Sequence, residues 1–468
     1  MRKRGISFLW AVMAVLLLLG ARLPLQAQAT DDELLKKLQQ QIDQLNQRLS
    51  EQENQNKALQ EQVNELLKEK QPAPAQAPVK LSAAEIPTVK TGGGEVLTIK
   101  GFIDTTFFSQ DQNFEFGNGQ NAEWPAPPQS EHNRWFSGGD ARNTRLTLDF
   151  QGPKLANGWS IHSLIEGDVF GGYNGTGPFS NEQTTPRLRL AYVDLVKGGT
   201  TIRLGQDWTP LFGNVPVSLS HIAFPLGYGS AGMVGWRFPG VYLYQDLTGK
   251  NAPTKVQFEL GLFQGSWNGP GNNLGWQSAG NVSFRPQLEA RFNFSGKAAG
   301  GSWSAYVVGH YDRKDLSGVD KTYTGALHNG SLDGKAAEIG AKFESEHWLF
   351  HGNAYYGEAI GQQFGNLTQF GDIKGWGAWF QAGYNFTENW SLFAFYGIDN
   401  PNDADVRAWV PSAGRLKNQQ TDFMLRYKVG PFALGLEWLH AQLDSANTFN
   451  TIRKTKGNQV ALSALYAF

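Results

Sequence analysis

Residues 287–294, QLEARFNF, set the structural class of this chain, because apolar and polar residues alternate along them without interruption. The apolar positions are Leu288, Ala290, Phe292 and Phe294. Successive side chains of a β-strand point to opposite faces of a sheet, so this period predicts a strand with one apolar and one polar face. Such a strand needs neighbours to pair with and something to cover its apolar face.

The same period of two recurs in segments of about ten residues from residue 95 to the end of the chain. Residues 142–150 and 255–262 repeat it clearly. We count sixteen such segments, the last four of which are 389–398, 420–429, 432–441 and 457–468. The sequence therefore predicts sixteen β-strands.

The connections between these segments alternate in length. Those after even-numbered segments are short, such as 387–388 and 430–431, whereas those after odd-numbered segments run to about 15–33 residues and are rich in Gly, Asn, Asp and Pro. A soluble β-sandwich could show the same alternation of side chains, but it has no reason to sort its loops by parity. A transmembrane barrel has short turns on one side and long loops on the other.

Aromatic residues and the last segment support the barrel interpretation. Tryptophan and tyrosine recur near segment ends, as in the aromatic girdles of membrane barrels: Trp159, Tyr192, Trp303, Tyr311, Trp348, Tyr356, Trp376, Tyr384, Trp390, Tyr396 and Trp438. Alternation continues to the final residue, Phe468. An open sheet edge in lipid would leave backbone groups unbonded, so the first and last strands should pair and close the barrel.

Composition excludes several other classes. Lys+Arg 41 against Asp+Glu 42 gives no basic excess, which argues against nucleic acid as a partner. The chain has no cysteine, so neither disulfides nor a lipid-modified cysteine is available. We expect no bound metal and no cofactor.

The N-terminus has the features of a secretory signal peptide at residues 1–29. Arg2, Lys3 and Arg4 precede an apolar run at 6–19, and small residues surround a cleavage site after about Ala29. The alternative, a membrane anchor, needs about 20 apolar residues. Cleavage removes four cations and no acid, which takes the net charge from −1 to −5. No later stretch is long and apolar enough to predict a transmembrane helix.

Residues 31–70 contain no aromatic residue and carry an unbroken heptad repeat. Its core positions are Leu35, Leu38, Ile42, Leu45, Leu49, Gln52, Asn56, Leu59, Val63 and Leu66. This predicts an α-helical coiled coil, and hence a homo-oligomer, although the pattern does not decide between two and three strands. A single amphipathic helix is the alternative, but the apolar stripe is too narrow for it. The Pro-, Ala- and Gly-rich residues 71–94 then read as a linker to a barrel at 95–468.

Taken together, these segments resemble the DcaP-like porins of Gram-negative outer membranes. The resemblance rests on that order of segments and on LTIKGF at 97–102, RLRLAYVDL at 187–195 and RLGQDW at 203–208. The terminal pattern with Tyr466 and Phe468 resembles the signal read by the outer-membrane assembly machinery. The resemblance implies a homotrimer in the cell outer membrane, in contact with the lipid bilayer and lipopolysaccharide, with its coiled coil in the periplasm.

Sixteen strands enclose a water-filled channel rather than a packed core. In sixteen-stranded porins the third long loop narrows this channel, and here that loop falls at residues 208–235. It is unusually apolar for an exposed segment, which favours packing inside the barrel. The candidate constriction residues are Phe212, Val217, His221 and Phe224. The alternative is that the loop folds outward over a neighbouring subunit.

Charged residues fall on the polar faces of the predicted strands. The candidate pore-lining residues are Arg145, Asp149, Arg187, Arg189, Arg203, Asp207, Glu259, Glu289 and Arg291. Two interpretations stay open: a basic wall facing an acidic wall, which would orient solutes, or pairing between adjacent strands, which only hydrates and stiffens the wall. Arg187 and Arg189 share parity with aliphatic residues further on, so a β-bulge near Tyr192 is expected.

The predicted function is a diffusion channel for small hydrophilic solutes with a weak preference for anions, including small organic acids or dicarboxylates as the resemblance suggests. No catalytic residue is assigned, because no Gly-x-Ser-x-Gly motif occurs. His347 and His351 would lie about 13 Å apart on a strand, too far to share a metal. The alternatives are a structural protein that tethers the outer membrane to the periplasm and an outer-membrane hydrolase.

Overall fold

A computed structural model describes residues 47, 88–90, 95–115, 117, 119–126, 135–171, 184–265, 285–316, 330–410, 414–446 and 451–468. The chain divides into two compact units, Met1–Lys80 and Leu81–Phe468. Apart from Gln47, every described residue belongs to the second unit. The predicted signal peptide and the coiled-coil core positions lie outside the described residues, as does nearly all of the predicted linker.

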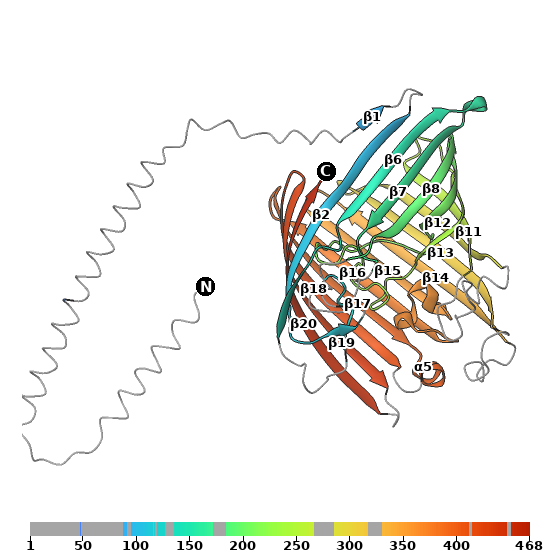
Figure 1. The fold of residues 1–468 in the computed structure, drawn as a ribbon. Helices are drawn as coiled ribbons and strands as arrows, with labels where there is room; N and C mark the ends of the chain where they lie inside the picture. Colours follow the sequence, from blue (N-terminus) through green and yellow to red (C-terminus); the bar gives the residue numbers. More distant parts are fainter. Residues whose placement is uncertain are drawn as a thin grey trace, which may run out of the picture. The chain divides into compact units, whose positions relative to one another are not determined.

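The second unit is a closed antiparallel β-barrel (Figure 1). Among the described residues, sixteen long strands form its wall: β2 (Val96–Gln110), β6 (Arg145–Lys154), β7 (Ser160–Asp168), β8 (Arg187–Lys197), β9 (Thr200–Trp208), β10 (Arg237–Asp246), β11 (Thr254–Phe263), β12 (Gln287–Ala298), β13 (Gly301–Asp315), β14 (Ser331–Glu344), β15 (Trp348–Glu358), β16 (Lys374–Asn385), β17 (Trp390–Pro401), β18 (Arg415–Val429), β19 (Phe432–Ala446) and β20 (Ile452–Ala467). The predicted strand number and fold class of the barrel are confirmed.

Four shorter strands accompany the wall. β1 (Thr88–Lys90) pairs with the start of β2, and β5 (Phe136–Asp140) pairs with its end. β3 (Phe114–Glu115) and β4 (Trp124–Pro125) form a separate hairpin. In the described part of the chain, no helix has the length and apolar character needed to cross a membrane.

The first and last strands close the barrel. β2 and β20 pair in an antiparallel register that includes Ile103 opposite Tyr466. The N–H of Gly101 donates to the carbonyl of Phe468, and the N–H of Phe468 donates back to Gly101, both at 3.0 Å. The alternation that runs to the end of the sequence therefore supplies the partner of the first strand.

Short and long connections alternate along the chain as predicted, with one correction. Short turns such as 299–300 and 430–431 lie at one end of the barrel, which we call the short-turn end, and residues 209–236 form a long loop from the other. The last connection, expected to be about fifteen residues, is only 447–451. β19 and β20 continue past their apolar segments, and polar residues there keep pairing, as in Gln442 opposite Lys456. Apolar alternation marks only the part of a strand that needs an apolar face.

Two strands of the wall are irregular. The strand that follows β2 along the chain is interrupted at 141–144. Its two parts, β5 and β6, both pair with β2. In β8 the register shifts between Leu188 and Leu190, which face Gly167 and Glu166, so that Arg189 is the bulged residue. The predicted bulge is therefore present three residues before Tyr192. It lets Arg187 and Arg189 face the acids of β7 while Val193 stays on the outer face, 44% exposed.

Side chains alternate between the two faces of the wall. On β14, Ile339 is 61% exposed on the outer face, whereas its neighbour Glu338 is 1% exposed and faces inward. Exposed tryptophan and tyrosine residues lie close to strand ends on the outer face, such as Trp348 and Trp390 after short turns. The wall thus presents an apolar band outward and polar groups inward.

Deleting Phe468 should destabilise the closed barrel by about 1–3 kcal/mol, because it removes two backbone hydrogen bonds at the seam between β2 and β20. The measurement is the midpoint of urea unfolding in detergent micelles, followed by the gel mobility of unheated samples. The F468Y variant, which keeps the backbone, is the control and should match the wild type. An unchanged midpoint in the deletion variant would contradict this role of Phe468.

Candidate functional site in the barrel lumen

Residues 209–236 leave β9 and pass through the inside of the barrel before entering β10. Most of them are buried, and their hydrogen bonds reach inward-facing side chains of β12, β15, β16, β18 and β19. Gly232, with φ +93°, passes so close to the wall that a Cβ there would lie 2.5 Å from the backbone nitrogen of Ala378. The loop therefore takes the inward of its two predicted courses.

The Glu437 carboxylate on β19 is the strongest anchor of this loop. It accepts hydrogen bonds from the backbone N–H groups of Leu219 (2.7 Å) and Ser220 (2.8 Å). It also accepts from the hydroxyls of Ser218 (2.7 Å) and Ser220 (2.9 Å). Hydrogen bonds to a carboxylate are about twice as strong as those between neutral groups. Glu437 thus fixes three consecutive loop residues against the wall.

Side-chain amides of the wall bind other parts of the loop. Gln381 on β16 accepts from the N–H of Val217 (2.7 Å) and donates to its carbonyl (2.8 Å), as the backbone of a neighbouring strand would. Gln420 on β18 accepts from the N–H of Gly227 (2.6 Å). A buried backbone must have its polar groups bonded, so these side chains make the inward course of the loop possible.

Two further connections enter the lumen and pack on the loop. The Ser230 hydroxyl donates to Glu123 (2.6 Å), which belongs to the connection after β2. The N–H of Gly235 donates to the carbonyl of Gln363 (2.7 Å), in the connection between β15 and β16. The Phe364 ring there stacks on Tyr228, with ring centres 4.6 Å apart. The three segments together fill part of the lumen.

The predicted constriction residues have different surroundings. Phe212 stacks on Trp208, with ring centres 3.6 Å apart. Val217 packs beside the buried cluster that contains Leu219 and Phe393, and the Phe224 ring lies 5.1 Å from that of Phe170. The fourth residue, His221, is described next.

His221 is 2% exposed, and burial lowers the pKa of its imidazole to about 4, against the raising effect of a backbone hydrogen bond at Ala122. The ring is therefore neutral at pH 7. His221 adds no charge to the lumen.

An arginine cluster lies on the wall formed by β6, β8 and β10. Arg189 binds Glu166 (2.7 Å) and Asp168 (3.0 Å), and Arg187 binds Asp168 (2.7 Å). Arg145 reaches Glu166 only at 3.7 Å. Three predicted pore-lining residues are thus brought together around two acids.

Arg237, at the start of β10, adds a further guanidinium beside this cluster. Its central carbon lies 4.5 Å from the ring centres of both Trp208 and Trp236. Arg189 approaches the same Trp208 ring at 5.7 Å. In the described residues, Nη1 of Arg237 and both Nε and Nη2 of Arg145 have no hydrogen-bond acceptor. These donors are therefore buried in the wall without a partner.

A second group of charges forms a continuous row across β2, β6, β7, β8 and β9. Lys100 binds Asp149 (2.6 Å), and His162 bridges Asp149 and Asp194 at 3.0 Å each. Arg203 binds Asp194 (2.7 Å) and also Asp207. Each cation of the row lies beside an acid of an adjacent strand or of its own.

The remaining predicted pore-lining residues lie on β11 and β12. Glu259 accepts a hydrogen bond from Asn293 (2.5 Å). Glu289 accepts from the N–H of Leu211 (2.6 Å), and Arg291 donates to the carbonyl of Pro210 (3.0 Å). Glu289 and Arg291 therefore hold the start of the loop.

Most ion pairs of the predicted residues join neighbouring strands, as in the second of the two sequence-based interpretations, and Arg203 also pairs with Asp207 on its own strand. Arg145 and Arg237 differ from these paired residues, because some of their side-chain N–H groups bond no acceptor. In the sequence, Arg237 is distinguished only by its place directly after Trp236, at the end of an apolar loop. Gln381 and Gln420 carried no sequence signal, because amides on a polar strand face are ordinary. Glu437 was recognisable as a lumenal acid but not as a loop anchor.

Comparison with solved structures gives three informative likenesses. The outer membrane channel DcaP of Acinetobacter baumannii matches with TM-score 0.59 and 20% identity over 81% of this chain and 99% of that chain. The anion-selective porin from Comamonas acidovorans matches with TM-score 0.51 and 13% identity, over 80% and 100%. Salmonella typhi OmpF, in complex with daunomycin, matches with TM-score 0.50 and 11% identity, over 82% and 100%.

No protein-family model matches the chain, and no curated protein matches it. At these identities the likenesses establish the fold. The chain has the fold of the outer membrane channel DcaP and of other porins, as the sequence resemblance predicted.

Replacing Glu437 with alanine should release the middle of the loop. The loss leaves the N–H groups of Leu219 and Ser220 buried and unbonded, at about 2–6 kcal/mol in total. We expect these two amides to lose most of their protection in hydrogen exchange measured by mass spectrometry. The matched control is E344A, which removes an acid whose ion pair is with Lys342. Equal protection in E437A and the wild type would contradict the anchoring role.

Proposed function

We propose that this chain is an outer-membrane porin, a water-filled diffusion channel for small hydrophilic solutes with a weak preference for anions. The proposal is supported by the fold, which it shares with known channels, and by the inner wall, which carries charged side chains on at least β6, β7, β8 and β9. Diffusion through such a lumen requires no chemistry and no cofactor.

In this proposal the short-turn end faces the periplasm and the long loops face outward, as in bacterial barrels of this type. The outer apolar band contacts the bilayer and lipopolysaccharide. The predicted signal peptide would direct export, and the assembly machinery would read Tyr466 and Phe468. We further propose a homotrimer held in part by the coiled coil at 31–70. Tethering to the periplasm depends on that same segment and remains a prediction.

The loop at 209–236 is proposed to form the constriction. Most of its anchors are on β12 to β19, and it also reaches the opposite side of the lumen, where the N–H of Ala223 donates to Asn143 (3.0 Å). On the other side, the side chains of Arg145 and Arg187 keep 15% and 17% of their surface exposed. Solutes would pass beside the loop, along the exposed surface of Arg145 and Arg187.

The arginine cluster is the observation that carries the anion preference. Arg145, Arg187, Arg189 and Arg237 are four cations, whereas Glu166 and Asp168 supply two negative charges. An excess of two positive charges at the narrow part favours anions there. Guanidinium groups suit carboxylates, which accept paired hydrogen bonds from them, and the Arg145 and Arg187 side chains are partly exposed. Small organic acids and dicarboxylates are therefore the proposed solutes.

The first test is the reversal potential in a potassium chloride gradient across a planar bilayer. Wild-type protein should favour chloride. R145Q should lower the anion-to-cation permeability ratio about tenfold, because one positive charge at roughly 6 Å in a water-like medium stabilises an anion and destabilises a cation by about 0.7 kcal/mol each. The control K374Q removes an exposed lysine at the long-loop end and should leave the ratio unchanged. Cation preference in the wild type would refute the proposal.

The second test removes residues 214–228 and measures single-channel conductance. The deletion should raise conductance, because the segment fills lumen volume against β16, β18 and β19. Gel mobility of the unheated protein serves as the control for an intact barrel. Unchanged conductance in a folded deletion variant would rule out the constriction role.

A further inference from the structure

Part of the lumenal face is apolar near the short-turn end of β15 to β20. Apolar residues of the loop and of the wall pack there as one group, which we call the apolar lumenal cluster: Val217, Leu219, Leu349, Phe393, Met424, Ala433 and Leu465. Trp348, Leu434 and Tyr466, each next to one of the wall residues, are exposed on the outer face. The cluster members beside them therefore face the lumen, and they lie within two residues of a strand end.

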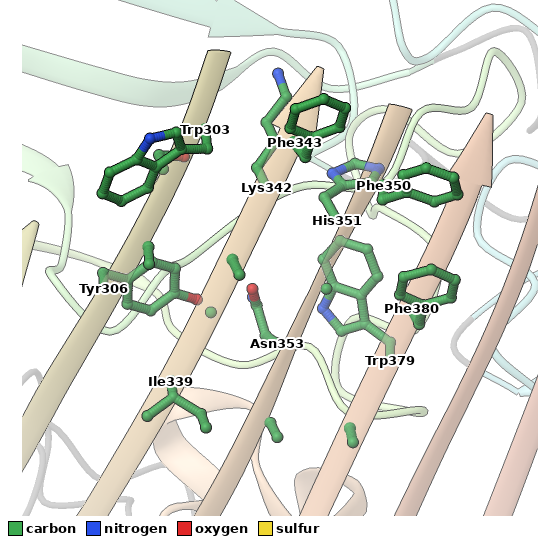
Figure 2. A pocket seen from close by; sticks show the side chains of 17 residues that line it. Trp303, Tyr306, Ile339, Lys342, Phe343, Phe350, His351, Asn353, Trp379 and Phe380 are labelled. Atoms are coloured by element: carbon green, nitrogen blue, oxygen red, sulfur yellow. The ribbon is translucent and has the colours of Figure 1, made fainter. Parts of the chain in front are cut away.

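Apolar residues at these positions depart from the rest of the lumenal face. On β15 the next two lumenal positions after Leu349 are His351 and Asn353, both polar (Figure 2). On β14, Lys342 lies opposite His351. Leu349 thus interrupts a polar column close to the place where the lumen opens at the short-turn end.

Only some members of the cluster are covered by the loop. Those on β17, β18 and β19 are buried and pack against Leu219. Leu349, Leu465 and Val217 are only half-buried. Val215, two residues earlier in the loop, is 41% exposed. Packing of the loop therefore accounts for the buried members, whereas the others keep apolar surface in contact with water, which is unfavourable.

Arg426, on β18, borders this apolar surface. The central carbon of its guanidinium lies 4.7 Å from the centre of the Phe393 ring, and Nη2 donates to the Ser391 hydroxyl at 3.4 Å. Nε is buried without an acceptor, but the side chain as a whole is only half-buried. Among the described residues, no carboxylate lies within ion-pair distance of it, whereas Arg187 and Arg203 each bind an aspartate. No neighbouring acid neutralises its charge.

We propose that this part of the lumen binds monocarboxylates that carry an apolar chain. The carboxylate pairs with Arg426, and the chain lies on Leu349, Leu465 and Val217. A cation without an acid suits a carboxylate, and an apolar surface suits a hydrocarbon chain. A short dicarboxylate would bring its second charge against the apolar residues, which costs free energy. The inference rests on the proposed porin function, because the solute reaches this site through the lumen.

The test measures how butanoate, hexanoate and octanoate interrupt the open-channel current in a planar bilayer. For the wild type, the dissociation constant should fall about tenfold from butanoate to octanoate, which corresponds to about 1.4 kcal/mol. Burial of roughly two of the added methylene groups is enough for this gain. Succinate should bind no more tightly than butanoate.

Two variants separate the parts of the site. L349N removes apolar surface and should abolish most of the difference between octanoate and butanoate. R426Q should weaken the binding of all three acids about fivefold, the effect of one charge at roughly 4 Å in a water-like medium. The controls L247N and K197Q remove a leucine and a cation at other short turns and should match the wild type.

Conductance in potassium chloride is recorded before any carboxylate is added. A wild-type channel that conducts but binds the three acids equally would overturn this site and leave the porin proposal intact, whereas a protein without conductance would overturn both. Tighter binding of succinate than of octanoate would also overturn the site, as would an L349N variant that keeps the full difference. If L349N does not fold, L349A takes its place, and the series of acids on the wild type decides by itself.

Discussion

The requirement that every backbone N–H and C=O be bonded governs this structure. In the wall it demands closure, and the pairing of β2 with β20 through Gly101 and Phe468 provides it. Inside the barrel the same requirement applies to residues 209–236, which have no regular strand to pair with. Glu437, Gln381 and Gln420 bond that backbone instead. One physical demand thus shapes both the barrel and what fills it.

The inner face of the wall consequently carries two kinds of polar residue. On β12 to β19, acids and amides hold the loop and are buried by it, as Glu289 and Glu437 are. On β6 to β9, charged residues pair with neighbours and keep some contact with water, as in the row through His162. Arg145 and Arg237 retain side-chain N–H groups that are buried without a hydrogen-bond acceptor.

Sequence periodicity predicted the barrel well, because a strand with an apolar outer face and a polar inner face must alternate. It predicted the sixteen strands and the bulge in β8, which follows from the parity of Arg189 and Val193. It failed at 447–451, where β19 and β20 extend beyond the apolar band and need no apolar face. It also could not distinguish Glu437 from any other lumenal acid, since anchoring depends on which loop atoms arrive opposite it.

The sequence by itself determined the fold class, the closure and the sorting of turns from loops, because a wall that is apolar outside and polar inside imposes a local and repetitive rule on every strand. Only the tertiary structure decided which charges neutralise one another and which loop residues meet the wall. Those pairings join positions far apart in the chain, such as Val217 and Gln381. Their partners are set by the register and curvature of the barrel, to which no local pattern corresponds.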